Sequence, residues 1–197
     1  MACDTPLIVI AAGGDGSRIG GAKPERVLDG QRLIDRMVMW ASQKTDAIAL
    51  AIRDCDGDWG TGLPLLRDPY VDIGPISALA SALHEAHRRD RKTVLLIGCD
   101  LPFLPDDLIP RLSAVLAENG VSMPLSHGRV HPMAALWRTD PAPLDQWIKQ
   151  GGQSMWRYAR DIGMAEVLWE ETPDPFTNIN DLEALARAEQ HLKTRCS

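Results

Sequence analysis

The chain has 197 residues, of which 45% are hydrophobic and 24% are charged, values that are ordinary for one soluble globular domain spanning residues 1–197. Its formal net charge of −6 argues against a general nucleic-acid binder and requires that any anionic ligand be held by local positive groups. No apolar stretch is long enough to span a bilayer and residues 1–6 lack a basic residue, which favours a cytoplasmic protein without membrane contact.

The first predicted element is a buried strand at residues 7–10, because its apolar run is continuous rather than alternating. It opens into a glycine-rich loop that carries Arg18 and ends near Lys23. Glycines allow the backbone to approach a ligand closely and expose N–H groups, while the two basic side chains add full positive charge. This combination predicts a polyphosphate site.

The loop matches neither of two common phosphate-binding motifs. The dinucleotide pattern G-x-G-x-x-G would begin at Gly14, but Ile19 stands where its third glycine belongs. The pattern G-x-x-x-x-G-K-[ST] would run from Gly16 to Gly21, but Ala22 occupies the lysine position. The alternatives are therefore a different polyphosphate site or a flexible connection with two solvated basic residues.

Strands and helices alternate along the rest of the chain. Asp29-Gly30 predicts a turn between short extended pieces within residues 26–33. Helical spacing or helix-start signals predict helices at 33–41, 74–89, from 105 onward, and at 141–149, 154–162 and 181–193. Apolar runs predict strands at 47–52, 63–66, 93–97, 121–125, 130–137 and 166–169, with a hairpin turn at 126–129. This order predicts a three-layer α/β domain with a mostly parallel sheet.

Two carboxylates follow predicted strands and therefore belong at the ligand-binding edge of a parallel sheet. Asp68 follows the strand at 63–66, and Asp100 follows the most hydrophobic strand of the chain. A carboxylate beside a polyphosphate loop suits Mg²⁺, which takes one or two carboxylates plus phosphate oxygens. Asp100 could equally serve as a helix N-cap or as one half of a buried ion pair.

The cysteines and histidines give little indication of a site. The four cysteines are widely spaced, which fits reduced thiols, and Cys99 is expected to be a small buried residue. His84 and His87 are three residues apart on a predicted helix, a spacing that permits shared metal binding. The basic residues that follow them favour a solvated helix end instead.

Five segments of the chain resemble those of the MobA-like nucleotidyltransferases and occur in the same order. The last of the five most resembles the molybdenum cofactor guanylyltransferase branch of that family. The segments are residues 11–20 with Lys23, Asp68 with Gly74-Pro75, residues 99–103, His131-Pro132, and residues 176–183. The resemblance implies a Rossmann-like sheet and the transfer of GMP from GTP to the phosphate of molybdopterin, with release of pyrophosphate. It also implies transient contact with proteins that supply molybdopterin and with molybdoenzymes.

The resemblance assigns roles position by position, with Mg²⁺ as the cofactor. It implies nucleotide contacts at Ala11, Ala12, Gly13, Lys23, Asp68 and Asp100, with Mg²⁺ held by Asp100. It implies catalytic roles for Arg18, Lys23 and Asp100, and acceptor-side contacts at Gly20, Gly74, Asn178 and Asn180. The backbone of residues 11–13, exposed by small side chains, is expected to recognise guanine.

Three positions depart from the family pattern. Ala78 stands where a second glycine is common, and Arg53 follows a strand where an asparagine is sometimes found. Residues 151–154 lack an arginine that is often present, which leaves Arg157 as the nearest candidate. These departures concern the pterin contacts and base recognition rather than the phosphate site.

Two alternatives to a guanylyltransferase remain at the level of sequence. One is a related transferase that uses CTP or another phosphorylated acceptor such as a sugar phosphate. The other is a non-catalytic nucleotide-binding module, against which the retained Lys23 and Asp100 argue. The preference for guanine depends on the resemblance of Asn178-Ile179-Asn180 to the guanylyltransferase branch.

Overall fold

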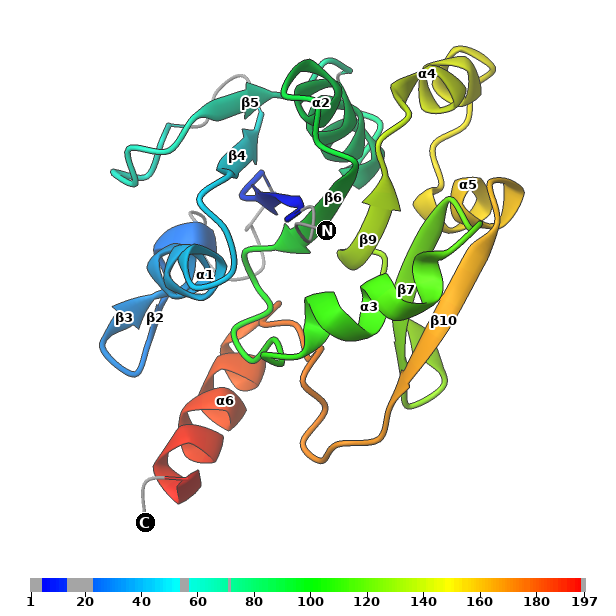
Figure 1. The fold of residues 1–197 in the computed structure, drawn as a ribbon. Helices are drawn as coiled ribbons and strands as arrows, with labels where there is room; N and C mark the ends of the chain where they lie inside the picture. Colours follow the sequence, from blue (N-terminus) through cyan, green and yellow to red (C-terminus); the bar gives the residue numbers. More distant parts are fainter. Residues whose placement is uncertain (1–4, 14–22, 54–56, 71, 196–197) are drawn as a thin grey trace.

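The computed structural model describes residues 5–13, 23–53, 57–70 and 72–195. Its centre is an eight-stranded sheet in the order β10-β7-β9-β6-β1-β4-β5, with β8 paired to β7 (Figure 1). The strands are β1 (Leu7–Ala11), β4 (Ile48–Ile52), β5 (Leu65–Arg67), β6 (Thr93–Gly98), β7 (Val121–Ser126), β8 (Arg129–Val130), β9 (Ala134–Arg138) and β10 (Met164–Trp169).

Most strand pairs are parallel, as the sequence predicted. β1 pairs in parallel with β4 and β6, β4 with β5, and β7 with β10. β9 is the exception inside the sheet, because it runs antiparallel to both β6 and β7. β8 pairs antiparallel with β7 as a hairpin whose turn residues, His127 and Gly128, both have positive φ. The predicted strand at 130–137 is therefore wrong as one element, since it divides into β8 and β9.

Helices cover both faces of the sheet and make the two outer layers of the predicted three-layer domain. They are α1 (Leu33–Ser42), α2 (Pro75–Arg88), α3 (Leu108–Leu116), α4 (Pro141–Lys149), α5 (Met155–Asp161) and α6 (Leu182–Arg195). α2, α4 and α5 contribute to one core, and α1 and α3 to the other (Figure 1). Within the described ranges, no helix is both long and apolar enough to cross a membrane.

The continuous apolar runs of β1 and β6 follow from these two cores. Leu7 and Val9 of β1 face the core beneath α2, whereas Ile8 and Ile10 face the core beneath α1 and α3. β6 alternates in the same way. Burial on both faces removes the polar side of the strand, which is why the sequence shows no alternation there.

The structure gives the exact bounds of the elements that precede α1 and of α3 itself. A short 3-10 helix, η2 (Lys23–Glu25), leads into the hairpin β2 (Val27–Leu28) and β3 (Gln31–Arg32). The predicted turn at Asp29 and Gly30 is confirmed, and both residues have positive φ. α3 begins at Leu108, three residues later than the sequence suggested.

After β10 the chain returns across the sheet edge to reach α6. Phe176, 1% exposed, stacks on His131 with 4.9 Å between ring centroids and meets Trp169 edge-on. Burial lowers the pKa of the His131 imidazole; Asp174 opposes this shift and Arg129 adds to it. The half-buried imidazole is therefore held in its neutral form more strongly than in the unfolded chain.

The lowered pKa of His131 predicts a pH-dependent stability. The unfolded chain protonates this imidazole near its ordinary value of 6.5, whereas the fold does so only at lower pH. Because the unfolded state binds more protons in that range, the free energy of unfolding should fall as pH drops from about 6.5 through the folded pKa. Urea denaturation from pH 7.5 to 5 measures this, and His131→Phe should flatten the profile. Equal slopes for both proteins would contradict the prediction.

Candidate functional site

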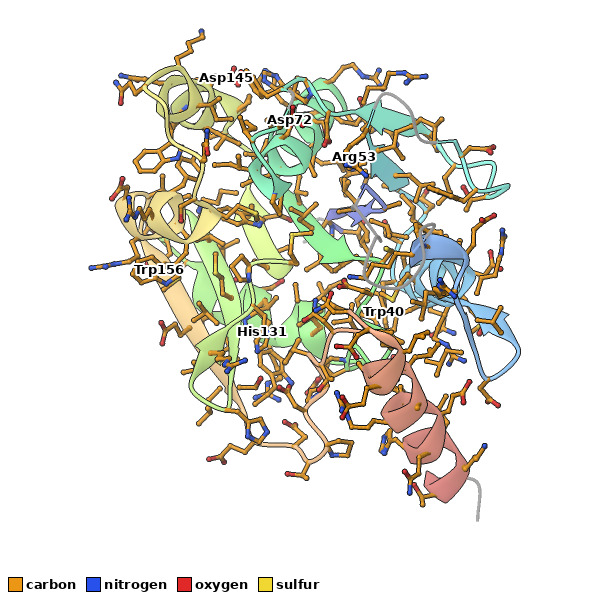
Figure 2. The ribbon with its side chains drawn as sticks, turned by 180° about the vertical axis from the view of Figure 1, so that it is seen from behind. Trp40, Arg53, Asp72, His131, Asp145 and Trp156 are labelled. Carbon is orange, nitrogen blue, oxygen red and sulfur yellow. The ribbon has the colours of Figure 1, made fainter. Side chains whose placement is uncertain are left out.

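A cavity of about 630 Å³ opens at the carboxyl ends of β1, β4, β5 and β6. These four strands are mutually parallel neighbours, so the residues that follow them meet at one edge of the sheet. The cavity is lined by Ala11, Ala12, Gly13, Lys23, Ala51, Arg53, Asp68, Tyr70, Asp72, Gly74, Pro75, Ala78, Gly98, Cys99, Asp100, Met133 and Asn178. Figure 2 shows Arg53 and Asp72 close together at this end of the molecule.

Asp100 is a nearly buried carboxylate at the end of β6. Its side chain is 12% exposed, and its Oδ2 lies 2.6 Å from Nζ of Lys23. Asn178 donates from Nδ2 to the same oxygen at 2.9 Å. The buried ion pair, one of three roles open from the sequence, is therefore present. Asp100 caps no helix, since α3 begins at Leu108 with Asp107 in the N-cap position.

Lys23 connects this carboxylate to the last part of the chain. Besides its ion pair with Asp100, its ammonium group donates to Oδ1 of Asn180 at 2.6 Å. We call Lys23, Asp100, Asn178 and Asn180 the clasp. It unites the start of η2, the end of β6 and the segment after β10, with sequence separations of 77, 78 and 157 residues.

The backbone next to the clasp fixes the two asparagines. The N–H of Ile179 donates to the carbonyl of Asp100 at 2.9 Å. The Ile179 side chain is 1% exposed and packs with Leu28, Leu33 and Ala188. One buried side chain and one backbone bond therefore hold the residue between Asn178 and Asn180 in place.

Part of the backbone at residues 11–13 is already used by the sheet. The carbonyl of Ala11 accepts from the N–H of Cys99 at 3.1 Å, and the N–H of Ala12 donates to Ala51 at 2.9 Å. All of residues 11–13 line the cavity, as the sequence suggested. Strand pairing therefore occupies the N–H of Ala12, whereas the Ala11 carbonyl keeps a second lone pair. Recognition of guanine by the backbone of residues 11–13 stays a prediction.

The opposite wall of the cavity is formed by the chain between β5 and α2. The N–H of Asp68 donates to Ile52 at 2.9 Å, which places its side chain at the strand end. The Ser77 hydroxyl accepts from the N–H of Tyr70 and donates to its carbonyl, at 3.1 and 2.9 Å. Gly74 occupies the N-cap of α2 with φ +76, and Pro75 follows in the first turn as predicted.

Tyr70 and Asp72 both line the cavity, but the sequence alone did not assign either of them to the site. The phenol of Tyr70 lies 3.4 Å from Oδ1 of Asp145, and burial followed by this carboxylate raises its pKa. The place of Tyr70 and Asp72 in the sequence was a signal, because they lie between Asp68 and Gly74, two residues that the sequence did assign to the site.

The surroundings of Cys99 and His84 fit structural roles for both side chains. Burial, followed by the adjacent Asp100, raises the pKa of the Cys99 thiol to about 12, which confirms it as a buried neutral residue. His84 lies 3.0 Å from Asp145 on the surface of α2. Among the described residues, no group of three or more His, Cys, Asp or Glu side chains is placed to hold a metal ion. His84 and His87 are therefore not part of such a centre.

Three other sequence candidates lie elsewhere. Arg18 and Gly20 fall outside the described residues. Arg157 is absent from the cavity wall, because it lies on α5 beside a separate hollow formed with Trp147 and Trp156. Ala78, by contrast, lines the cavity and is 6% exposed.

Residues 8–162 match the family model of the MobA-like NTP transferase domain. A molybdenum cofactor guanylyltransferase of Rhodobacter capsulatus is 36% identical over 94% of this chain and 95% of its own length. A protein of the same name from Acidiphilium cryptum is 33% identical over 92% of each chain.

Solved structures share the fold. Molybdopterin-guanine dinucleotide biosynthesis protein A from Archaeoglobus fulgidus superposes with a TM-score of 0.78 at 20% identity, over 95% of this chain and 98% of its own. The 2-C-methyl-D-erythritol 4-phosphate cytidylyltransferase of Thermus thermophilus superposes with a TM-score of 0.68 at 16% identity, over 94% and 98%.

Gly98 provides a test of the Asp100 position. A Cβ at residue 98 would overlap Oδ1 of Asp100, so Gly98→Ala must displace the carboxylate. We expect the free energy of unfolding to fall by about 1–3 kcal/mol, the usual cost of overpacking. Gly57→Ala is the control, because a Cβ there meets no atom within 4 Å. Chemical denaturation compares the two variants, and equal stability would show that Asp100 is not held against Gly98.

Proposed function

The chain belongs to the MobA-like NTP transferase family, and from this membership we propose that it transfers GMP from GTP to the phosphate of molybdopterin. The products are molybdopterin guanine dinucleotide and pyrophosphate. Relatives named molybdenum cofactor guanylyltransferase support this acceptor, because they align over nearly the whole chain. The observation that carries the proposal is the ion pair of the clasp, because Lys23 and Asp100 bring a cation and a carboxylate together in the wall of one cavity.

The residue types fit this reaction. An oxygen of the molybdopterin phosphate attacks the α-phosphorus of GTP, and the bond from that phosphorus to the bridging oxygen of pyrophosphate breaks. Because the phosphate is already anionic at neutral pH, the attack requires no general base. It requires in-line placement and compensation of the repulsion between two anions. We assign the compensating charge to Lys23 and Arg18.

Asp100 suits Mg²⁺ because it lines the cavity and because one of its carboxylate oxygens is available as a ligand. Both of its hydrogen bonds fall on Oδ2, and within the described part of the chain Oδ1 accepts none. A single carboxylate facing a cavity is sufficient, because Mg²⁺ completes its shell with phosphate oxygens and water. When bound, the ion would neutralise charge on the transferring phosphoryl group.

The remaining roles are assigned as the family resemblance implies. Ala11, Ala12, Gly13 and Lys23 are assigned to the nucleotide. Asp68 is assigned to the guanine edge, because a carboxylate accepts hydrogen bonds from the N1–H and N2–H₂ donors of that base. Gly20, Gly74, Asn178 and Asn180 are assigned to the acceptor side.

The product formed from each nucleotide tests the proposed function. The protein is incubated with Mg²⁺, molybdopterin and each of ATP, CTP, GTP and UTP, and the dinucleotide is identified by mass spectrometry. We expect the guanine product, and GTP should bind at least roughly tenfold more tightly than CTP, a difference of about 1.4 kcal/mol. A cytosine product, or equal affinities, would instead indicate a cytidylyltransferase.

We also expect transient docking with the proteins that supply molybdopterin and with molybdoenzymes.

Substitution of Asp100 tests the metal assignment. Asp100→Asn keeps the size of the side chain but removes its charge, so the fold should persist while kcat falls about 100-fold or more. Calorimetric titration should also show weaker Mg²⁺-dependent binding of GTP. Asp90→Asn, at a fully exposed carboxylate, is the matched control. Wild-type turnover and Mg²⁺ dependence in Asp100→Asn would remove Asp100 from the mechanism.

A further inference from the structure

A hydrogen-bonded cluster outside the cavity connects β7 to the chain segment that carries the two asparagines of the clasp. The Ser126 hydroxyl, at the end of β7, lies 2.7 Å from Nε2 of His131 and 2.9 Å from Oδ1 of Asp174. Oδ1 of Asp174 also accepts from the N–H of Phe176 at 2.9 Å. Ser126 is 1% exposed, so these contacts are shielded from water.

The chemistry of these groups fixes where the protons are. A carboxylate only accepts, so the single hydroxyl proton of Ser126 is donated to Asp174. Ser126 must then accept from His131, whose Nε2 carries the proton. The chain of donation therefore runs from His131 through Ser126 to Asp174.

This direction excludes a hydrolytic triad. A nucleophilic serine gives its proton to the histidine, and the aspartate holds the other ring nitrogen. Here the serine lies between the other two groups and is buried. None of the three side chains lines the cavity, and Figure 2 shows His131 well apart from Arg53 and Asp72. Any effect of the cluster on the site must therefore pass through another part of the chain.

That part is the segment from Asp174 to Asn180. Its first residue is held by Ser126, and Thr177 bonds back to the carbonyl of Asp174 through both its N–H and its hydroxyl. Phe176 is stacked on the His131 ring. Asn178 and Asn180 follow directly and contact Asp100 and Lys23. The cluster thus fixes one end of the segment whose other end completes the clasp.

We propose that Ser126, His131 and Asp174 are positioning residues that hold Asn178 and Asn180 against the catalytic carboxylate and ammonium groups. The effect on turnover depends on the proposed guanylyl transfer. The positioning itself does not, since it concerns contacts within this chain. Both asparagine side chains are at least partly exposed, so burial does not fix them, and their placement depends on how the segment that carries them is held.

The test compares matched substitutions in the full-length protein. Ser126→Ala removes the central hydroxyl, and Ser122→Ala is the control. Ser122 lies on the same strand, is 0% exposed, and its hydroxyl has no hydrogen-bond partner in the described part of the chain. Asp174→Ala removes the acceptor, whereas Asp174→Asn retains an oxygen that can accept from both Ser126 and Phe176. Amide hydrogen exchange of residues 174–180 is measured together with kcat per folded enzyme.

We expect Ser126→Ala and Asp174→Ala to accelerate exchange at Phe176 and Ile179 and to lower kcat about 10- to 100-fold, the loss typical of misplacement by about 1 Å. Ser122→Ala and Asp174→Asn should stay near wild type. If Ser126→Ala does not fold, the two Asp174 variants carry the same comparison. Unchanged exchange and kcat in Ser126→Ala or Asp174→Ala would overturn the proposal. Absence of guanylyl transfer in the wild type would instead refute the proposed function and leave the exchange result to decide the positioning.

Discussion

The ion pair between Lys23 and Asp100 organises the rest of the site. Both side chains are largely withdrawn from water, at 16% and 12% exposure. A buried carboxylate without a partner is strongly destabilising, by about 3–5 kcal/mol when one member of a buried pair is removed. Lys23 supplies the opposite charge, and the two asparagines satisfy additional hydrogen bonds. The pair is thus electrically balanced, and in the proposed reaction an incoming triphosphate with its Mg²⁺ would offer each member a new partner of the required sign.

The sheet brings the strand ends of the site together at one edge. Parallel pairing of β1, β4, β5 and β6 delivers four strand ends to one edge, and burial of β1, β4 and β6 on both faces leaves these three strands little freedom to shift. Gly98 then lets the carboxylate of Asp100 fold back over the end of β6, where a larger residue would overlap it. Rigid strands therefore set the position of the site, and the segments that follow them supply its chemistry.

The sequence predicted the parts of this arrangement that depend on local patterns. Asp100 follows an uninterrupted apolar run, Asp29-Gly30 favours positive φ, and Pro75 suits a first helical turn, so each was predictable from its neighbours. The contact of Lys23 with Asn180 was not predictable, because it joins residues 157 positions apart. The hydrogen bonds from His131 through Ser126 to Asp174 were not predictable either, because they depend on how β7 and the chain after β10 pack together. The antiparallel direction of β9 relative to β7 follows from the predicted hairpin turn at 126–129, whereas nothing in the local sequence indicates that β9 also pairs with β6.

The distance along the chain between the members of the clasp has a consequence for synthesis. Lys23 leaves the ribosome long before Asn180, and at about 5–20 residues per second the 157 intervening residues take roughly 8–30 s. The strands β1, β4, β5 and β6 are all synthesised well before that interval ends, so a nascent chain can acquire this edge of the sheet while the residues that close the site are still missing. Completion of the site is therefore among the last events in the maturation of the polypeptide, which separates the appearance of a folded sheet from the appearance of activity.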